Sequence, residues 1–202
     1  MSKGERTRKD IVDKAFAMAG EIGLEAVSLG VLASETGLSK SGLFVHFKSK
    51  EALQLEVIDE VIRRFIDDVV RPALAQARGE PRLQVFFDRY LHWIAHSRAN
   101  GGCLYMSLTH EYDDRPGPIR DRLVVSHSDF CDTLTRIVNA AKDEGHFRPD
   151  VDAELFVFEF SGIKMAYHHQ LKFLRLPRAL DCARAAFEQL LTRCRAPANL
   201  ST

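Results

Sequence analysis

The sequence lacks any apolar run that approaches the roughly 18 residues a helix needs to cross a bilayer. Its first ten residues, MSKGERTRKD, are polar and contain no apolar core of a signal peptide. It also lacks a CxxC pair, since its cysteines stand far apart at Cys103, Cys131, Cys182 and Cys194. These absences predict a cytoplasmic protein with reduced thiols and no membrane partner. A thiol-sensing role for Cys103 or Cys131 stays open beside ordinary burial as small hydrophobes.

An excess of charge of one sign is missing as well. Lys plus Arg and Asp plus Glu each total 28, so the formal net charge is zero. No electrostatic argument for nucleic acid follows from the whole chain. Residues 1–50 contain eight basic and six acidic residues, with basic residues gathered at 3–9 and 40–50. Any nucleic-acid surface must therefore be local.

The sequence shows no sign of catalytic machinery. No nucleophile–base pair, Gly-rich phosphate loop or carboxylate pair stands at a telling spacing, so we expect neither an enzyme nor a cofactor. His92 and His96 are four residues apart, which is the helical spacing for sharing a metal, and His168 and His169 offer further nitrogens. These histidines have no Cys or carboxylate partner nearby in the sequence, and we expect no metal site.

The sequence is rich in helical periodicity. Apolar residues recur three and four positions apart between Gly and Pro breaks, and no strand pattern or repeat competes with them. The expected helices are 6–22, 28–36, one that begins after Ser39, 49–71, 83–99, 103–111, 118–144, 153–175 and 178–194. Pro72 is expected to end the fourth of them. The pattern predicts an all-α fold.

Two short helices are expected close together near the N-terminus. Ser28 is placed to cap the first, with Val27 and Leu32 forming a hydrophobic staple around it, and Gly37 supplies the stop. The same arrangement repeats at once from Ser39. Two helices joined this closely predict a helix-turn-helix.

Residues 6–58 resemble the DNA-binding domain of the tetracycline-repressor family, most clearly in GLSKSGLFVHFKSKEAL at 37–53. A helix start, an aromatic residue, a His-x-Phe pair and a Ser-Lys-Glu start fall there at the offsets typical of the family. The resemblance covers about a quarter of the chain. It implies a three-helix helix-turn-helix domain followed by a larger helical domain that binds an effector and dimerises. The predicted boundaries are 1–50 for the first domain and 51–197 for the second, with a connecting helix at 49–71 and a tail at 198–202.

The third helix must divide its side chains between packing and DNA. Leu43 and Phe47, four residues apart, fit the inward face. The residues expected near DNA are Ser39, Lys40, Ser41, Gly42 and Val45. Lys40 is the best candidate to read a base, because its ammonium group can donate to guanine O6 and N7. Contact with a phosphate alone, or simple solvation, is the alternative.

The resemblance also implies contacts with DNA phosphates. The family's phosphate-contacting positions fall on Ser28, Phe44, His46 and Lys50, and Lys48 lies beside them. Phe44 departs from the family pattern, because a tyrosine commonly stands there and gives its hydroxyl to a phosphate. Gly30 also departs from it, so we expect little base reading from the second helix. Capping or packing for His46, and ordinary surface charge for the two lysines, are the alternatives.

The remainder of the chain is interpreted as the effector-binding domain that the resemblance implies. Six polar-tipped aromatic and histidine side chains are candidates to line an apolar cavity and to offer a ligand hydrogen bonds. They are Tyr90, Trp93, Tyr105, His110, Tyr167 and His168. This part of the chain contains no dense basic cluster, so a small apolar or aromatic effector is favoured over a polyphosphate.

The last two long helices have more apolar surface than one core needs. Segments 153–175 and 178–194 carry apolar residues on more than one side. A four-helix bundle formed with a second copy would cover the surplus, which predicts a homodimer with Phe187 and Leu190 at its seam.

These features together predict a transcriptional repressor. A homodimer would place two third helices in successive major grooves of a near-palindromic double-stranded DNA operator, and effector binding would release it. The alternative is an all-helical small-molecule carrier or adaptor whose helix-turn-helix contacts protein.

Overall fold

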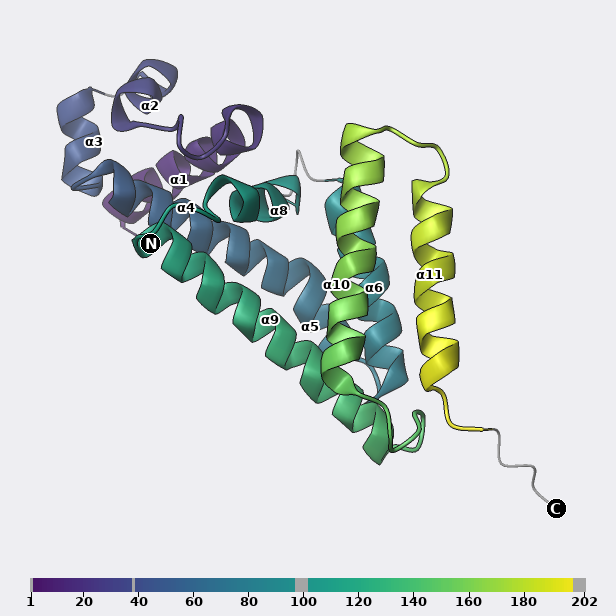
Figure 1. Ribbon diagram of the computed structural model, residues 1–202. Helices are drawn as coiled ribbons and strands as arrows, with labels where there is room; N and C mark the ends of the chain where they lie inside the picture. The colour runs from purple at the N-terminus through teal and green to yellow at the C-terminus, as the bar shows by residue number, and fades with distance from the viewer. Residues whose placement is uncertain (1, 38, 97–101, 198–202) are drawn as a thin grey trace. The chain divides into compact units, whose positions relative to one another are not determined.

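The computed structural model describes residues 2–37, 39–96 and 102–197, with only the backbone of Lys3, Lys40, Gly102 and Cys103. Within these ranges the regular structure is helical (Figure 1), apart from one antiparallel bridge between Phe147 and Arg195. None of the described helices combines the length and apolarity that a membrane span requires. The expected all-α fold is confirmed.

The helices follow the predicted order, and their described ends lie within a few residues of the predicted ones. They are α1 (Lys3–Ile22), α2 (Leu29–Thr36), α3 (Lys40–His46), α4 (Lys50–Phe65), η1 (Ile66–Val70), α5 (Arg71–Leu74), α6 (Glu80–Ala95), α8 (Gly102–Glu111), α9 (Pro118–Asp143), α10 (Ala153–His168), η2 (His169–Phe173) and α11 (Ala179–Cys194). The predicted end at residue 99 lies outside the described residues.

Pro72 does not end the fourth helix, and that prediction is wrong. α4 passes into the π-helical turn η1, and α5 continues to Leu74 with Pro72 in its first turn. A proline is tolerated in a first turn, where its missing N–H would have no helical partner. The π turn changes the hydrogen-bond register just before it, so the chain stays helical through the proline.

The chain forms two compact units. The first unit contains Met1–Ile66 and His96–His127, and the second contains Asp67–Ala95 and Ser128–Thr202. Helix α9 runs from one into the other. These units do not coincide with the predicted domains 1–50 and 51–197, which are divided by expected function, and that division stays a prediction.

A buried apolar face and one arginine join α1 to α4 in the first unit. Arg64 on α4 lies over the ring of Phe16 on α1, with 4.0 Å from its guanidinium carbon to the ring centroid. The same guanidinium donates to Asp13 and to Glu60, both at 2.6 Å. The arginine therefore ties the long helix to the first helix through packing and charge together.

Aromatic rings fill the core of the second unit. Phe87 of α6 stacks on Phe187 of α11 with ring centroids 3.9 Å apart, and Phe160 of α10 meets both edge to face. Phe130 of α9 joins the same cluster through Phe86 and Phe160. Side chains from four helices thus interlock in a single contact network.

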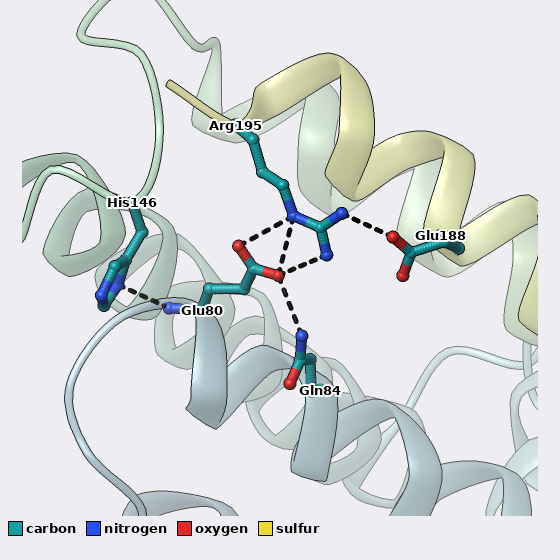
Figure 2. Close-up of polar contacts among 5 residues, drawn as sticks. All are labelled: Glu80, Gln84, His146, Glu188 and Arg195. Atoms are coloured by element: carbon teal, nitrogen blue, oxygen red, sulfur yellow. Dashed lines mark hydrogen bonds and ion pairs between the residues drawn. The ribbon is translucent and has the colours of Figure 1, made fainter. Parts of the chain in front are cut away.

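A polar cluster joins the end of α11 to the start of α6 (Figure 2). Arg195 donates through Nε and Nη2 to the Glu80 carboxylate at 3.0 and 2.6 Å, and through Nη1 to Glu188 at 2.5 Å. The backbone N–H of Glu80 donates to His146 Nδ1 at 3.2 Å. Three segments that are distant in sequence are therefore held together at this end of the second unit.

Gly79, just before α6, is required by this cluster. Its φ is +85°, and a Cβ there would lie 2.3 Å from His146 Nδ1 and 3.1 Å from Ala141 Cα. We expect Gly79→Ala to lower the free energy of unfolding by about 2–3 kcal/mol, since backbone strain adds to a clash. Gly145 has a φ of +72°, but a Cβ there would have nothing within 4 Å. Gly145→Ala should therefore cost only about 1 kcal/mol.

Urea denaturation of the two variants measures the difference. Equal losses of stability would show that the His146 contact yields and that only the positive φ matters.

Candidate functional site

Helix α3 is a short, well-seated helix that presents apolar side chains to solvent. Leu43 and Phe47 are buried, as predicted, and anchor the helix in the first unit. Val45 and Phe44 point outward and keep 73% and 43% of their surface exposed. Gly37, in the left-handed conformation with φ +68°, ends α2 and lets α3 begin three residues later. This is the geometry of a helix-turn-helix.

Serine hydroxyls cap the helices around this motif, as the sequence predicts. Ser28 Oγ accepts from the N–H of Val31 at 3.2 Å at the start of α2, and Ser39 Oγ accepts from the N–H of Gly42 at 3.0 Å at the start of α3. Ser39 and Ser41 also share a hydrogen bond of 3.0 Å between their hydroxyls. A capping hydroxyl keeps its own hydrogen, and at a helix N-terminus that hydrogen and the free N–H groups favour an anion.

Arg8 of α1 holds the other end of α3. Its guanidinium donates to the backbone carbonyl of His46 and to the Glu56 carboxylate, and it lies 4.6 Å from the ring centroid of Phe47. A cation at this end satisfies a carbonyl that the helix leaves free and complements the helix dipole. Sequence reasoning missed Arg8, because these two partners lie 38 and 48 residues away. Its one signal was membership of the basic group at 3–9.

Lys50, a predicted phosphate contact, is paired with a carboxylate. Its Nζ donates to Glu25 Oε1 at 2.6 Å, and this hydrogen bond lowers the pKa of Glu25. The Tyr112 hydroxyl donates to the other oxygen of Glu25 at 3.3 Å. Both members of the ion pair are exposed enough for such a pair to contribute at most about 1 kcal/mol, so a phosphate can replace Glu25.

The backbone that carries Glu25 is held by α8. The Glu111 carboxylate accepts from the N–H groups of Leu24 and Glu25 at 3.2 and 2.7 Å. Gln54 of α4 donates to the carbonyl of Leu24 at 2.9 Å in a buried position. The loop between α1 and α2 is therefore fixed on both sides, and so is the partner of Lys50.

The remaining predicted DNA contacts lie on the same few elements. Ser41 and Lys48 are exposed and Gly42 and His46 are half-buried, whereas the side chain of Lys40 lies outside the described residues. Gly30 is exposed, with only Ser28 Oγ near its hypothetical Cβ, at 3.8 Å. The predicted set thus comes from the N-cap of α2, from α3 with its cap, and from the turn into α4.

The six predicted ligand-binding residues divide between the two units. Tyr90, Trp93, Tyr167 and His168 belong to the second unit, where the first three are buried and His168 is half-buried. Tyr105 and His110 belong to the first unit, where His110 is exposed. Burial raises the pKa of Tyr167, and burial with the nearby Lys172 lowers that of His168. Their role in ligand binding stays a prediction.

Tyr105 occupies a polar and aromatic contact inside the first unit. Its ring lies between Phe65 and His127, with centroids 5.0 and 4.6 Å away, and its hydroxyl shares a hydrogen bond of 2.9 Å with Ser126. Next to this stack is a cavity of about 240 Å³ that sequence reasoning did not predict. Its lining residues are Thr109, Tyr112, Asp113, Arg120, Leu123, Val124 and His127.

Lys164 is a buried cation that sequence reasoning also missed. It is 5% exposed, and its Nζ lies 3.4 Å from the Tyr90 hydroxyl and 4.3 Å from the ring centroid of Phe130. Burial lowers the pKa of Lys164 to about 8, against a small opposing effect of Cys131. The signal was available, since Lys164 stands four residues after Phe160 and three before Tyr167 on the buried face of α10.

His92 on α6 and His96 directly after it, the pair considered for a metal, are both exposed. Among the described residues, no group of three or more His, Cys, Asp or Glu is arranged to hold a metal ion. Cys131, Cys182 and Cys194 are free thiols, and burial raises the pKa of Cys194.

Two family models match the chain, one in its N-terminal part and one over most of the rest. Residues 11–57 match "Bacterial regulatory proteins, tetR family", and residues 79–187 match "Tetracyclin repressor-like, C-terminal domain". The HTH-type transcriptional repressor KstR2 of Mycobacterium tuberculosis is 31% identical in an alignment 162 residues long, which covers 76% of this chain and 74% of that protein. These families and relatives are transcriptional regulators and not enzymes.

Two solved structures share the fold. A TetR transcriptional regulator from Chloroflexus aurantiacus superposes with a TM-score of 0.85 at 22% identity, over 98% of this chain and 100% of that one. AibR, in complex with isovaleryl coenzyme A and operator DNA, superposes with a TM-score of 0.69 at 19% identity, over 94% and 98%.

The Lys50–Glu25 pair predicts opposite effects of two substitutions. Lys50→Ala should weaken binding to every duplex alike and lower the salt slope by about one, because one phosphate contact is lost. Glu25→Gln should strengthen binding to every duplex, because Lys50 no longer exchanges a carboxylate for a phosphate. Fluorescence anisotropy with specific and random duplexes over a range of salt measures both. Unchanged binding in both variants would remove Lys50 from the interface.

Lys164 predicts a stability that rises with pH. Its pKa of about 8 in the folded protein lies below the ordinary value of 10.5, so the unfolded chain binds more protons between these two pH values. The cost of burying the charge is complete below pH 8 and is relieved above it. From pH 7 to pH 9.5, wild type should gain about 2 kcal/mol of unfolding free energy relative to Lys164→Met. Urea denaturation at both pH values measures the change. If the unfolding free energy changed by the same amount with pH in the two proteins, the prediction would be wrong.

Proposed function

The chain belongs to the tetR family of bacterial regulatory proteins, and from this premise we propose that it is a ligand-responsive repressor. It binds a near-palindromic double-stranded DNA operator as a homodimer and leaves it when a small effector binds. The observation that carries the proposal is the outward face of α3, where Val45 and Phe44 stand exposed on a helix anchored by Leu43 and Phe47. Such an apolar face on a short, firmly seated helix serves a partner rather than the core.

The exposed side chains on α3 suit direct reading of bases in the major groove. Val45 can contact a thymine methyl group, and the Ser41 hydroxyl can donate or accept. Lys40, in the first turn of α3, is the candidate for guanine. Phe44 offers apolar contact with a sugar or a methyl group in place of a hydroxyl to a phosphate.

Phosphate contacts surround these base readers. Ser28 and Ser39 contribute capping hydroxyls, and Lys48 and Lys50 contribute charge at the start of α4. His46 is available as a further donor from the last turn of α3. These contacts would orient α3 without reading sequence, and they account for binding by a protein whose net charge is zero.

An exposed apolar stripe on α10 supports the homodimer. Leu155, Phe158 and Met165 lie on one exposed face of this helix, at i, i+3 and i+10, and Phe158 keeps 76% of its surface exposed. Gly162 falls on the same face at i+7, with nothing within 4 Å of a Cβ position, so a second helix can approach closely. An apolar stripe of this kind matches the same stripe of a second copy across a two-fold axis.

Phe187 and Leu190, which the sequence analysis places at the seam, are less suited to it than the α10 stripe. Phe187 and Leu190 are 5% and 2% exposed within one protomer, and Phe187 stacks on Phe87 in the core of the second unit. The helical spacing of α11 identifies an apolar face but not which neighbour covers it. In this chain α6 and α10 cover it, and the surplus lies on α10.

Effector binding is the remaining part of the proposal. AibR, a structural neighbour, has been solved with isovaleryl coenzyme A and operator DNA, so this fold accommodates both kinds of partner. The aromatic core of the second unit favours a small molecule with an apolar or aromatic body. The effector must prefer the state that does not bind DNA, and operator DNA must then weaken effector binding by the same factor.

A mobility shift tests DNA binding directly and separates a regulator from a carrier that contacts protein. The probe is an inverted repeat from the DNA next to this protein's own coding region, compared with a duplex of scrambled sequence. We expect the repeat to bind at least about 1,000-fold more tightly. Lys40→Ala should weaken binding by about 1–3 kcal/mol and relax preference at one base pair in each half-site. Equal, weak binding of both duplexes would favour the carrier.

The α10 stripe predicts which substitution prevents pairing. Phe158→Glu should give a folded monomer, because it buries an unpaired charge only in the dimer. Val125→Glu, at an exposed apolar site in the first unit, is the matched control and should leave the dimer intact. Phe187→Glu should unfold the protein instead.

Sedimentation velocity and circular dichroism measure association and folding separately. A monomeric wild type at micromolar concentration would overturn the homodimer, and a dimeric Phe158→Glu would place the seam on another surface.

A further inference from the structure

Among the Lys and Arg side chains that the structure describes, Lys164 stands apart because it is buried with no carboxylate beside it. Its ammonium group has three hydrogens to donate. The Tyr90 hydroxyl at 3.4 Å lies beyond the 2.7–3.2 Å of an ordinary hydrogen bond. Its other neighbours include the ring faces of Phe130 and Tyr90, at 4.3 and 5.1 Å, and the Cys131 thiol, which acts on it electrostatically. Ring faces compensate a buried charge only in part.

Acidic partners of Lys164 are absent within the described ranges. No carboxylate in them forms an ion pair with its Nζ within 4.0 Å. Every Asp and Glu of the sequence falls within these ranges, since the segments 1, 38, 97–101 and 198–202 contain none. A carboxylate partner for Lys164 must therefore come from outside the chain's Asp and Glu side chains.

We propose that Lys164 binds the carboxylate of the effector, which is a monoanionic acid with an apolar or aromatic body. This inference rests on the proposed function and names the chemical class of its ligand. One buried cation balances one negative charge, whereas a phosphate dianion would leave an uncompensated charge in an aromatic surrounding. The rings of Phe86, Phe130 and Phe160 pack on one another here, and they would have to shift to admit the apolar body of such an acid between them.

A second lysine, in the turn that follows α10, is held by a backbone carbonyl. Lys172 follows Lys164 by eight residues, in the π-helical turn η2, and its Nζ donates to the carbonyl of Ala95 at 3.1 Å. Neither lysine has a carboxylate partner among the described residues, although both face α6. π-helical turns occur often at functional sites, where they re-aim side chains.

Phe130 connects this site to the rest of the chain. Its ring covers Nζ now, and a carboxylate that approaches Nζ takes the place of that ring face. Phe130 belongs to α9, and the same helix continues into the first unit. An effector that displaces the ring therefore acts on a helix shared with the DNA-binding part of the chain.

Matched acids and amides test the inference on the full-length protein. The probes are 4-phenylbutyrate with 4-phenylbutanamide, and octanoate with octanamide, titrated calorimetrically at pH 7. We expect the acids to bind at least about tenfold more tightly than their amides. Lys164→Met should abolish this preference without weakening the amides. Lys142→Met is the matched control, because Lys142 donates only to the carbonyl of Val151 in the same unit and should leave the preference intact.

Proton uptake gives a readout that a purely structural lysine would not change. At pH 8 about half of Lys164 is neutral, so binding an acid should draw about half a proton from the buffer. Calorimetry in buffers of different ionisation enthalpy measures this uptake. It should vanish in Lys164→Met, which should remain folded because a methionine fits the same space without the charge.

Three results would overturn the inference: no binding of either acid, equal affinity for acid and amide, or an acid preference that survives in Lys164→Met. The proposed function fails separately. If the acids bind through Lys164 but leave operator affinity unchanged, the site stands and its ligand is not an inducer. If an amide releases operator DNA as well as the acid does, the repressor stands and the role of Lys164 falls.

Discussion

The packing of α3 against α2, together with its contact with Arg8 of α1, is the constraint on which the proposed DNA-binding surface depends. Leu43 and Phe47 bury one side of a helix only seven residues long, and a helix of that length is not stable on its own. Arg8 covers the outer face of Phe47 and binds the carbonyl at the end of the helix. With one side fixed in this way, Val45 is held toward solvent, where a rigid apolar contact with a base becomes possible.

Lys50 in the first unit and Lys164 in the second differ in whether a carboxylate lies beside the ammonium group. In the first unit, Lys50 is paired with Glu25 at the surface, so a phosphate could replace Glu25 as its partner at little cost. In the second unit, Lys164 is buried among rings with no carboxylate partner in the described chain, so its charge is costly until an anion arrives. The first arrangement suits reversible binding of DNA, and the second suits selection of one class of ligand.

The sequence predicts features that depend on neighbouring residues and fails where distant residues meet. The caps at Ser28 and Ser39, the stop at Gly37 and the inward side of α3 follow from spacing within one or two turns, and the structure confirms them. The partners of Arg8 and Lys50 are not predicted, because nothing in the local pattern identifies them. Pro72 misleads for a related reason, since a π turn accommodates it and leaves no sign in the sequence.

The same limit applies to the second unit. Periodicity identifies apolar faces on α10 and α11 but cannot assign them to the core or to a second copy, and so it does not separate the buried Phe187 from the exposed Phe158. The sequence does show Lys164 at helical spacing between apolar residues on one face of α10. A lysine at such a position is usually taken for a surface residue, and only the packing of Phe130 and Tyr90 around it reveals a buried charge.

Photocrosslinking from α3 tests the central claim most directly, because it reports contact and not only affinity. With p-benzoylphenylalanine in place of Val45, the account predicts crosslinks to bases in both half-sites of the operator, about one helical turn or a multiple of it apart. The same substitution at Ala185, an exposed residue of α11, is predicted to give none. Crosslinks from position 45 to protein only, or DNA crosslinks of equal yield from both positions, would contradict the account.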